Sequence, residues 1–206
     1  MPRRTKEDAE KTRASLLDAA ELLFLRQGVA ATTLEEIARE AGLTRGAVYW
    51  HFDNKMDLFQ AMIARVRMPI ELMYEELFAP TNDDLIAGLK RLCLEMLRTL
   101  EKDTHMRNVF TIMRLRCEQL NCNTDDYAKD ISAKRQIALT RFTKVFSWAE
   151  KKHMLTKGIT PEFAAIALYS FFSGIFWDYL REPKIYKLGK LAPHLVGSFF
   201  RGILKD

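Results

Sequence analysis

One short stretch of this 206-residue chain gathers side chains that are suited to binding another molecule rather than to packing. Two apolar residues in it, Val48 and Phe52, lie four positions apart, so in a helix they face the same way and can anchor it to a core. The other side chains then face outward, and they are Thr44, Arg45, Tyr49, Trp50 and His51. A solvated structural helix rarely displays this set, whereas a helix that enters the major groove of DNA uses it.

These outward side chains differ in the contacts they can make with DNA. Arg45 is able to donate two parallel hydrogen bonds to O6 and N7 of guanine, which reads a base. Gly46 lets the backbone approach the groove closely. Thr44, Tyr49 and His51 carry donors suited to phosphates, which set position rather than sequence. His51 has no Ser, Cys or Asp partner at a suitable spacing, so we predict no catalytic site there.

The residues just before this stretch predict a first helix and a tight turn. Thr33, followed three residues later by Glu36, is a capping box that begins a helix. The apolar face of that helix consists of Leu34, Ile37, Ala38 and Ala41. Gly42 supplies the left-handed backbone conformation of a sharp corner, and Thr44 caps the helix that follows. The whole segment is therefore predicted to be a helix–turn–helix.

Lys55 opens the next helix, which Asn54 caps with Asp57 at its third position. A lysine in the first turn opposes the helix dipole, so its placement against local preference suggests a function. A phosphate at that helix end would be attracted by the ammonium and by the free backbone N–H groups. The alternative is an ordinary solvated lysine. Beside Thr44, Tyr49 and His51, we favour the phosphate contact.

Total charge contributes little to this interpretation. The chain carries a net charge of +5, but residues 1–67 hold 11 Lys and Arg against 10 Asp and Glu, a net of +1. A DNA-binding role must therefore rest on where the charges lie. Residues 1–10 form a basic N-terminal arm. Two interpretations of this arm are about equally supported: it is a disordered tail, or it contacts phosphates or the minor groove of DNA.

Composition indicates a soluble globular protein without structural metals or disulfides. Hydrophobic residues make up 48% and charged residues 29% of the chain. Cys93, Cys117 and Cys122 are an odd set without metal-ligand spacing, so we expect buried cytoplasmic thiols; a redox sensor has no further support. The charged N-terminus has no apolar signal region, and the fifteen uncharged residues from Phe163 to Trp177 are short for a membrane span. We predict a cytoplasmic protein without a membrane partner.

The fold class predicted along the chain is all-α, with about nine to ten helices and no credible strand. A helix over residues 11–27 precedes the helix–turn–helix, and Met68-Pro69 is predicted to interrupt the fourth helix and to mark the domain boundary. Residues 11–67 then form the DNA-binding domain and residues 68–206 a ligand-binding and dimerisation domain. Further helices are predicted over residues 70–78, 82–103 (capped by Thr81 or Asn82), 105–120, 125–153, 161–179 and 193–204, with a basic loop at 184–190.

The segment from Lys11 to Phe59, above all LTRGAVYWHFDNKMDLF, resembles the DNA-binding domain of TetR/AcrR-family transcriptional repressors. The opening RRTKEDAEKTRASLLDAAELLF is similar to the subgroup that represses multidrug-efflux operons. The resemblance implies DNA contacts at Thr33, Thr44, Arg45, Gly46, Tyr49, Trp50, His51 and Lys55. It also implies a TetR-like homodimer without cofactors that binds a palindromic operator and is released by a small-molecule inducer. The alternatives are a TetR-type sensor of a fatty acyl or similar metabolite and, from another class, an enzyme with an appended DNA module.

Two uses compete for the apolar surface of the C-terminal region. A helix that is apolar nearly all round must be buried on every side, which suggests a four-helix subunit interface about a twofold axis; the alternative is an intramolecular core helix. Candidate interface residues are Phe171, Ile175, Phe176, Val196, Phe199 and Phe200. Candidate ligand-pocket residues are Met73, Met96, Phe110, Met113, Arg114, Cys117, Phe146, Phe172 and Trp177. Each aromatic residue taken singly is more often core, and for Arg114 a surface ion pair with Glu118 is favoured over a place in the pocket.

One motif in this region resembles part of a metal site. Glu150 and His153 have the Glu-x-x-His spacing of di-iron helix bundles, but such sites need a second copy, which the sequence lacks. We therefore predict no metal site, no cofactor and no enzyme activity.

Overall fold

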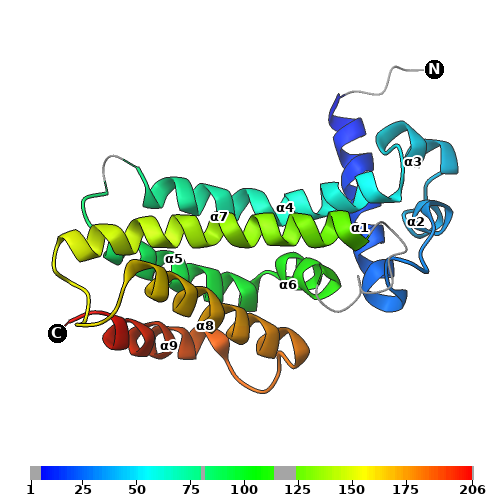
Figure 1. Ribbon diagram of the computed structural model, residues 1–206. Helices are drawn as coiled ribbons and strands as arrows, with labels where there is room; N and C mark the ends of the chain where they lie inside the picture. Colours follow the sequence, from blue (N-terminus) through cyan, green and yellow to red (C-terminus); the bar gives the residue numbers. More distant parts are fainter. Residues whose placement is uncertain (1–5, 80–81, 114–123, 206) are drawn as a thin grey trace. The chain divides into compact units, whose positions relative to one another are not determined.

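A computed structural model describes residues 6–79, 82–113 and 124–205, and these residues contain nine α-helices (Figure 1). They are α1 (Lys6–Gln27), α2 (Leu34–Glu40), α3 (Arg45–His51), α4 (Lys55–Leu77), α5 (Leu85–Lys102), α6 (Thr104–Thr111), α7 (Thr124–Lys151), α8 (Pro161–Arg181) and α9 (Leu188–Ile203). An isolated bridge joins Leu155 to Leu204. The predicted all-α class is confirmed.

The chain divides into two compact units. The first comprises Met1–Pro69 and His105–Asn121, and the second Ile70–Thr104 and Cys122–Asp206. The division within α4 falls close to the boundary that Met68-Pro69 suggested. However, α6 is grouped with the N-terminal unit, although the sequence offered no reason to separate it from the C-terminal domain.

The core of the first unit forms where α1 packs against the helices that follow it. The apolar face of α1 is buried, and it consists of Leu16, Leu17, Ala20, Leu23 and Phe24. Phe24 meets Phe59 of α4 edge-on, with ring centroids 6.0 Å apart. Gly28 ends α1 with a φ of 85°, which explains a glycine at this position.

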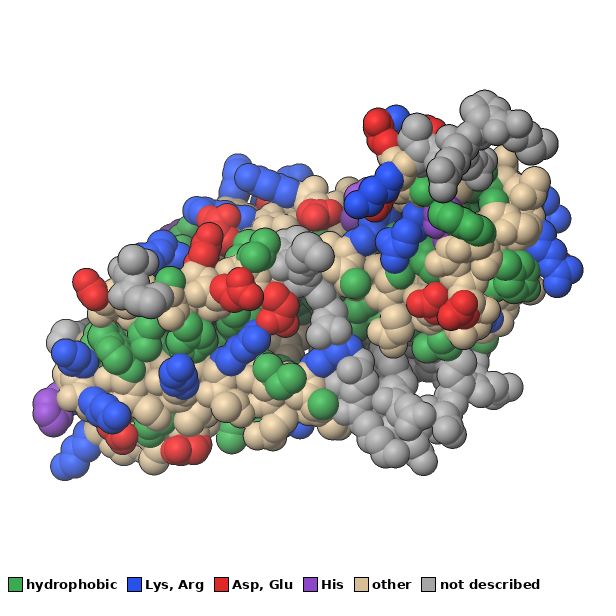
Figure 2. All heavy atoms as spheres, turned by 90° about the horizontal axis from the view of Figure 1, so that it is seen from above, with side chains coloured by type: hydrophobic (Ala, Val, Ile, Leu, Met, Phe, Trp, Pro, Cys, Tyr) green, Lys and Arg blue, Asp and Glu red, His purple; other side chains and the backbone are tan. Residues whose placement is uncertain are grey.

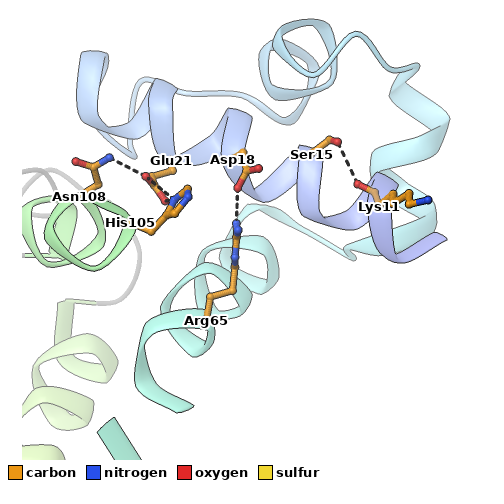
Figure 3. A network of polar contacts seen from close by, with 7 residues as sticks. All are labelled: Lys11, Ser15, Asp18, Glu21, Arg65, His105 and Asn108. Atoms are coloured by element: carbon orange, nitrogen blue, oxygen red, sulfur yellow. Dashed lines mark hydrogen bonds and ion pairs between the residues drawn. The ribbon is translucent and has the colours of Figure 1, made fainter. Parts of the chain in front are cut away.

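A polar network also joins α1 to α6 and α4 in the first unit (Figure 3). The buried Glu21 carboxylate accepts a hydrogen bond from Asn108 Nδ2 at 2.7 Å and lies 2.9 Å from Nδ1 of His105. One turn earlier, Asp18 pairs with Arg65 of α4 at 2.6 Å. A buried carboxylate requires such partners. The contacts of Glu21 with His105 and Asn108 therefore explain why α6 is grouped with this unit. The residues around Glu21 in the sequence gave no sign of this role.

The second unit is a bundle in which α7 packs on α8, and α5 packs on both α7 and α9. Thr160 caps α8, accepting from the N–H of Phe163, and Pro161 is the first residue of the helix. At the start of α9, the N–H of Gly189 donates to the Glu101 carboxylate of α5 at 3.0 Å. The expected burial holds for Cys93, and it raises the pKa of that thiol. Cys117 and Cys122 lie outside the described residues.

Two predictions that concern prolines are wrong, namely the interruption of the fourth helix at Met68-Pro69 and the start of the last helix at Pro193. Helix α4 continues through Pro69, and α9 begins at Leu188 with Pro193 inside it, so residues 188–190 are not a loop. A proline removes one backbone hydrogen bond and crowds the preceding turn, but buried side chains on both sides can outweigh that cost. In α4 they are Ile63, Val66, Tyr74 and Leu77, and in α9 they are Leu188, Ala192, Val196 and Phe200.

Several predicted helix ends also differ from the structure. Helix α1 already begins at Lys6, so the second half of the expected N-terminal arm is helical. Asp84, not Thr81 or Asn82, caps α5 by accepting from the N–H of Ala87. The Asn82 amide instead donates to the carbonyl of Leu77, the last residue of α4. The first five residues of the predicted arm, which include Arg3 and Arg4, lie outside the residues that the structure describes.

Helix α8 is less buried within one chain than its composition suggested. Phe163 is 55% exposed and Ile166 50% exposed. By length and composition alone, α8 is the one helix in the described residues that could cross a membrane. The expectation that this helix is covered on every side is therefore not met by its own chain, which leaves an apolar face without cover.

Candidate nucleic-acid interface

The first helix of the helix–turn–helix begins with the predicted capping box. The Thr33 hydroxyl accepts from the N–H of Glu36 at 3.2 Å, and the Glu36 carboxylate accepts from the N–H of Thr33 at 2.8 Å. That backbone hydrogen bond, followed by one from the Thr33 hydroxyl, lowers the pKa of Glu36. These contacts fix where α2 starts, and they leave the Thr33 side chain exposed.

The turn between α2 and α3 has the predicted chemistry. Gly42 adopts a φ of 66°, and the N–H of Leu43 bonds back to the carbonyl of Ala38 at 2.8 Å. Thr44 then caps α3, accepting from the N–H of Ala47 at 3.3 Å. As an acceptor in the cap, the Thr44 hydroxyl keeps its own hydrogen for an outside partner. The turn thus sets the direction in which α3 leaves α2.

Helix α3 is anchored on one side and open on the other. Val48 and Phe52 are buried, as predicted, whereas Trp50 is 70% exposed. Tyr49 is also exposed, and the Trp50 and His51 rings meet edge-on at 4.5 Å. A Cβ added at Gly46 would meet only the Thr44 hydroxyl, at 3.9 Å, so the backbone there is open. Thr44, Arg45, Gly46, Tyr49 and Trp50 are therefore all exposed, whereas His51 is half-buried.

Arg45 has two neighbours on this surface. Its Nη1 lies 2.7 Å from Oε1 of Glu35 in α2, and its guanidinium carbon lies 5.4 Å from the centroid of the Tyr49 ring. The Arg45 side chain is nevertheless 66% exposed. Sequence reasoning missed Glu35, because a glutamate in the first turn of a helix is ordinary by its local preference.

Lys55 has a role that the sequence did not suggest. Its ammonium donates to the carbonyls of Val29, Ala30 and Thr32 at 2.7, 3.0 and 2.8 Å. These carbonyls belong to the loop between α1 and α2, so all three N–H donors hold that loop against the start of α4. The phosphate contact predicted at Lys55 stays untested. In the observed conformation, however, the ammonium has no donor left for it.

Two further features bear on contact with a polyanion. Arg13 of α1 lies over the Phe52 ring at 5.2 Å, which places a cation beside the end of α3. Elsewhere, basic and acidic side chains are interspersed on the face shown in Figure 2 rather than gathered in one basic field. The interface is therefore defined by particular side chains, in agreement with the near-neutral charge of the first 67 residues.

Comparisons with known proteins decide the family. The family model described as bacterial regulatory proteins, tetR family, matches residues 16–62, and that of the MAATS-type transcriptional repressor C-terminal region matches residues 84–204. The chain belongs to the TetR family. It is 34% identical to the transcriptional regulator TtgR of Pseudomonas putida over 187 residues, covering 89% of this chain and 87% of TtgR.

Solved structures of TetR-family proteins share the whole fold of this transcriptional repressor. NalD, the secondary repressor of the MexAB-OprM multidrug efflux pump in Pseudomonas aeruginosa, is 40% identical with a TM-score of 0.85, covering 98% of this chain and all of NalD. A complex of SmeT with triclosan is 32% identical with a TM-score of 0.82, covering 95% and 93% of the two chains. SmeT is the repressor of the multidrug efflux pump SmeDEF of Stenotrophomonas maltophilia.

The residues predicted to line a ligand pocket in this TetR-family protein fall into both compact units, and some lie outside the described residues. Phe110 and Met113 belong to the first unit, and Arg114 and Cys117 lie outside the described residues. In the second unit, Met73, Met96 and Phe172 are half-buried and Trp177 is exposed. Phe146 is fully buried beside Phe200, with ring centroids 6.4 Å apart, so it is a core residue. The pocket remains a prediction.

The predicted dimer residues also separate into two groups. Val196 and Phe200 are buried within their own chain, so their assignment to a subunit surface is wrong. Apolar periodicity indicates that a side chain is buried, but not which chain buries it. The half-buried remainder is Phe171, Ile175, Phe176 and Phe199, of which Phe171 and Phe199 stack at 5.3 Å between α8 and α9.

The Glu-x-x-His motif lies at the end of α7. Both Glu150 and His153 are exposed, and the backbone of His153 is left-handed with a φ of 57°, just beyond the last helical residue. Within the part of the chain that the structure describes, no group of three His, Cys, Asp or Glu side chains is arranged to hold a metal ion.

Proposed function

We propose that this protein is a dimeric repressor that binds a palindromic operator and controls a multidrug efflux operon. A small hydrophobic or cationic compound binds the C-terminal domain and releases the repressor from DNA. Support for the regulated operon comes from the efflux-pump repressors NalD and SmeT, and support for the type of ligand comes from the triclosan complex of SmeT. A regulator of this kind acts in the cytoplasm, where the operator lies.

The observation that carries DNA binding is the exposed face of α3. It is turned outward by the buried anchors Val48 and Phe52, and it exposes the large side chains of Tyr49 and Trp50. We assign base reading to Arg45 and close backbone approach to Gly46. The phosphate and sugar contacts are assigned to Thr33, Thr44, Tyr49, Trp50 and His51. Lys55 supports the same surface from within by holding the loop before Thr33.

The uncovered face of α8 supports dimerisation. Phe163 and Ile166 lie three positions apart and are both half exposed or more, so they form one apolar strip at the start of the helix. An apolar strip of this kind on a water-soluble regulator is normally covered by a partner. A second copy of the chain, packing α8 and α9 against their symmetry mates, is the simplest cover.

The function is tested by recovering the DNA that the purified protein retains. Genomic fragments bound at physiological salt are sequenced, and we expect enrichment of one inverted-repeat site next to genes for efflux-pump components. Triclosan, added to the retained complex, is expected to release the fragment. Enrichment beside genes for fatty acid metabolism would support the metabolite-sensing alternative. Recovery of fragments without any common sequence would contradict the proposal.

Placing a charge on the exposed strip of α8 is expected to break the dimer. The double substitution Phe163→Glu and Ile166→Glu introduces four carboxylates across a twofold interface, where an unpaired buried charge is strongly unfavourable. Light scattering coupled to size exclusion should report a dimer for the wild type and a monomer for this variant. Leu22→Glu, at an equally exposed apolar position on α1, is the control and should remain dimeric. A wild-type monomer at micromolar concentration would refute the interface.

A further inference from the structure

The surface that we assign to DNA contains an acidic side chain that phosphate repulsion alone would disfavour. Glu35 lies in the first turn of α2, two residues after Thr33, and its side chain is 58% exposed. A carboxylate on a surface that faces phosphates lowers the affinity for any DNA. A residue that acts against the general requirement of its surface is a candidate for a specific role.

The neighbouring Glu36 shows what an ordinary acidic residue does at this helix end. Its carboxylate accepts from the backbone N–H and the hydroxyl of Thr33 and from the Gln27 amide, so it completes the cap. Glu36 therefore already provides the negative charge that favours the start of α2. Glu35 is not needed for that purpose, and its carboxylate is directed to Arg45 instead.

The ion pair between Glu35 and Arg45 engages one nitrogen of the guanidinium. Oε1 of Glu35 lies 2.7 Å from Nη1, and the Tyr49 ring lies under the guanidinium plane at 5.4 Å. Nε and Nη2 stay available, and these two donors form the edge that can make two parallel hydrogen bonds with O6 and N7 of guanine. The carboxylate and the ring thus hold the guanidinium while its base-reading edge stays free.

We propose that Glu35 is a positioning residue that makes Arg45 selective for guanine and keeps it from phosphates. This inference rests on the proposed DNA-binding function and names the residue that determines its specificity. At a guanine, Arg45 gains two acceptors without releasing Glu35. At any other base, its strongest alternative is a phosphate, which Glu35 opposes by holding Nη1 and by repelling the phosphate. Discrimination therefore comes from penalising the wrong sequence as well as from rewarding the right one.

The test uses Glu35→Gln, which removes the charge and keeps the size of the side chain. Duplexes are first selected by the wild-type dimer from a random-sequence library, and affinities for the selected and a scrambled duplex are measured over a range of salt concentrations. We expect affinity for the scrambled duplex to rise about fivefold, and its salt slope to steepen by about two, because Arg45 of each subunit then reaches a phosphate. Affinity for the selected duplex should change less than about threefold, so the ratio of the two affinities falls.

Glu40→Gln is the matched control, because it removes the same charge from the same helix. Glu40 pairs with Arg26 at 4.0 Å rather than with Arg45. In a second control, Glu35→Gln is combined with Arg45→Ala, where it should no longer change the salt slope for the scrambled duplex. The inference is overturned if Glu40→Gln changes the affinity ratio as much, or if the effect of Glu35→Gln persists without Arg45. If the wild type selects no sequence at all, the proposed function itself fails.

Discussion

Replacing Arg45 with alanine is expected to lower affinity for the operator by about thirtyfold or more, because the dimer loses one bidentate base contact, worth roughly 1–3 kcal/mol, in each of its two half-sites. Affinity for random duplex should fall much less, because Arg45 is paired with Glu35 and contributes little to non-specific binding. The base preference at one position of each half-site should also relax. Fluorescence anisotropy with selected and scrambled duplexes measures both affinities, and selection from a random library measures the preference.

Arg26→Ala is the control for this substitution. The Arg26 side chain is 61% exposed, close to the 66% of Arg45, and it also pairs with a glutamate of α2. It lies in the last turn of α1 and not on α3, so its loss should leave the base preference unchanged. If Arg45→Ala binds operator and random duplex as the wild type does, Arg45 does not read a base.

Replacing Lys55 with methionine is expected to destabilise the first unit by about 2–3 kcal/mol, because it removes charge-assisted hydrogen bonds and leaves partly buried carbonyls unpaired. Methionine keeps the length of the aliphatic stem, so the loss reports the ammonium. DNA affinity should fall for every sequence, since the loop that leads to Thr33 is no longer held. Chemical denaturation and anisotropy on the same variant measure the two effects.

The salt dependence of DNA binding separates this role from a direct phosphate contact. A lysine on a phosphate would, when removed from both subunits of the dimer, lower the slope of affinity against salt by about two and leave stability unchanged. A lysine that only holds the loop would lower stability and leave the slope unchanged, which is the result that we expect. Lys11→Met, at an exposed ion pair on α1, is the control and should change stability by less than about 0.5 kcal/mol.

The sequence by itself determined the helix–turn–helix, and the reason is that its signals are local. A capping box at Thr33, a left-handed residue at Gly42 and a cap at Thr44 depend on residues within a few positions of one another. The spacing of Val48 and Phe52 likewise specifies which side of α3 is buried. The exposed face of α3 could therefore be predicted residue by residue.

Only the tertiary structure decided which distant groups those residues meet. Lys55 reaches carbonyls that lie 23 to 26 positions earlier, and Glu21 meets His105 and Asn108, which lie 84 and 87 positions later. Helix α4 continues through Pro69 because buried neighbours outweigh a local rule. Helix propensity and apolar periodicity predict where a helix forms and which of its faces is buried. They carry no information on which partner covers that side, since contacts between distant segments depend on how the whole chain packs.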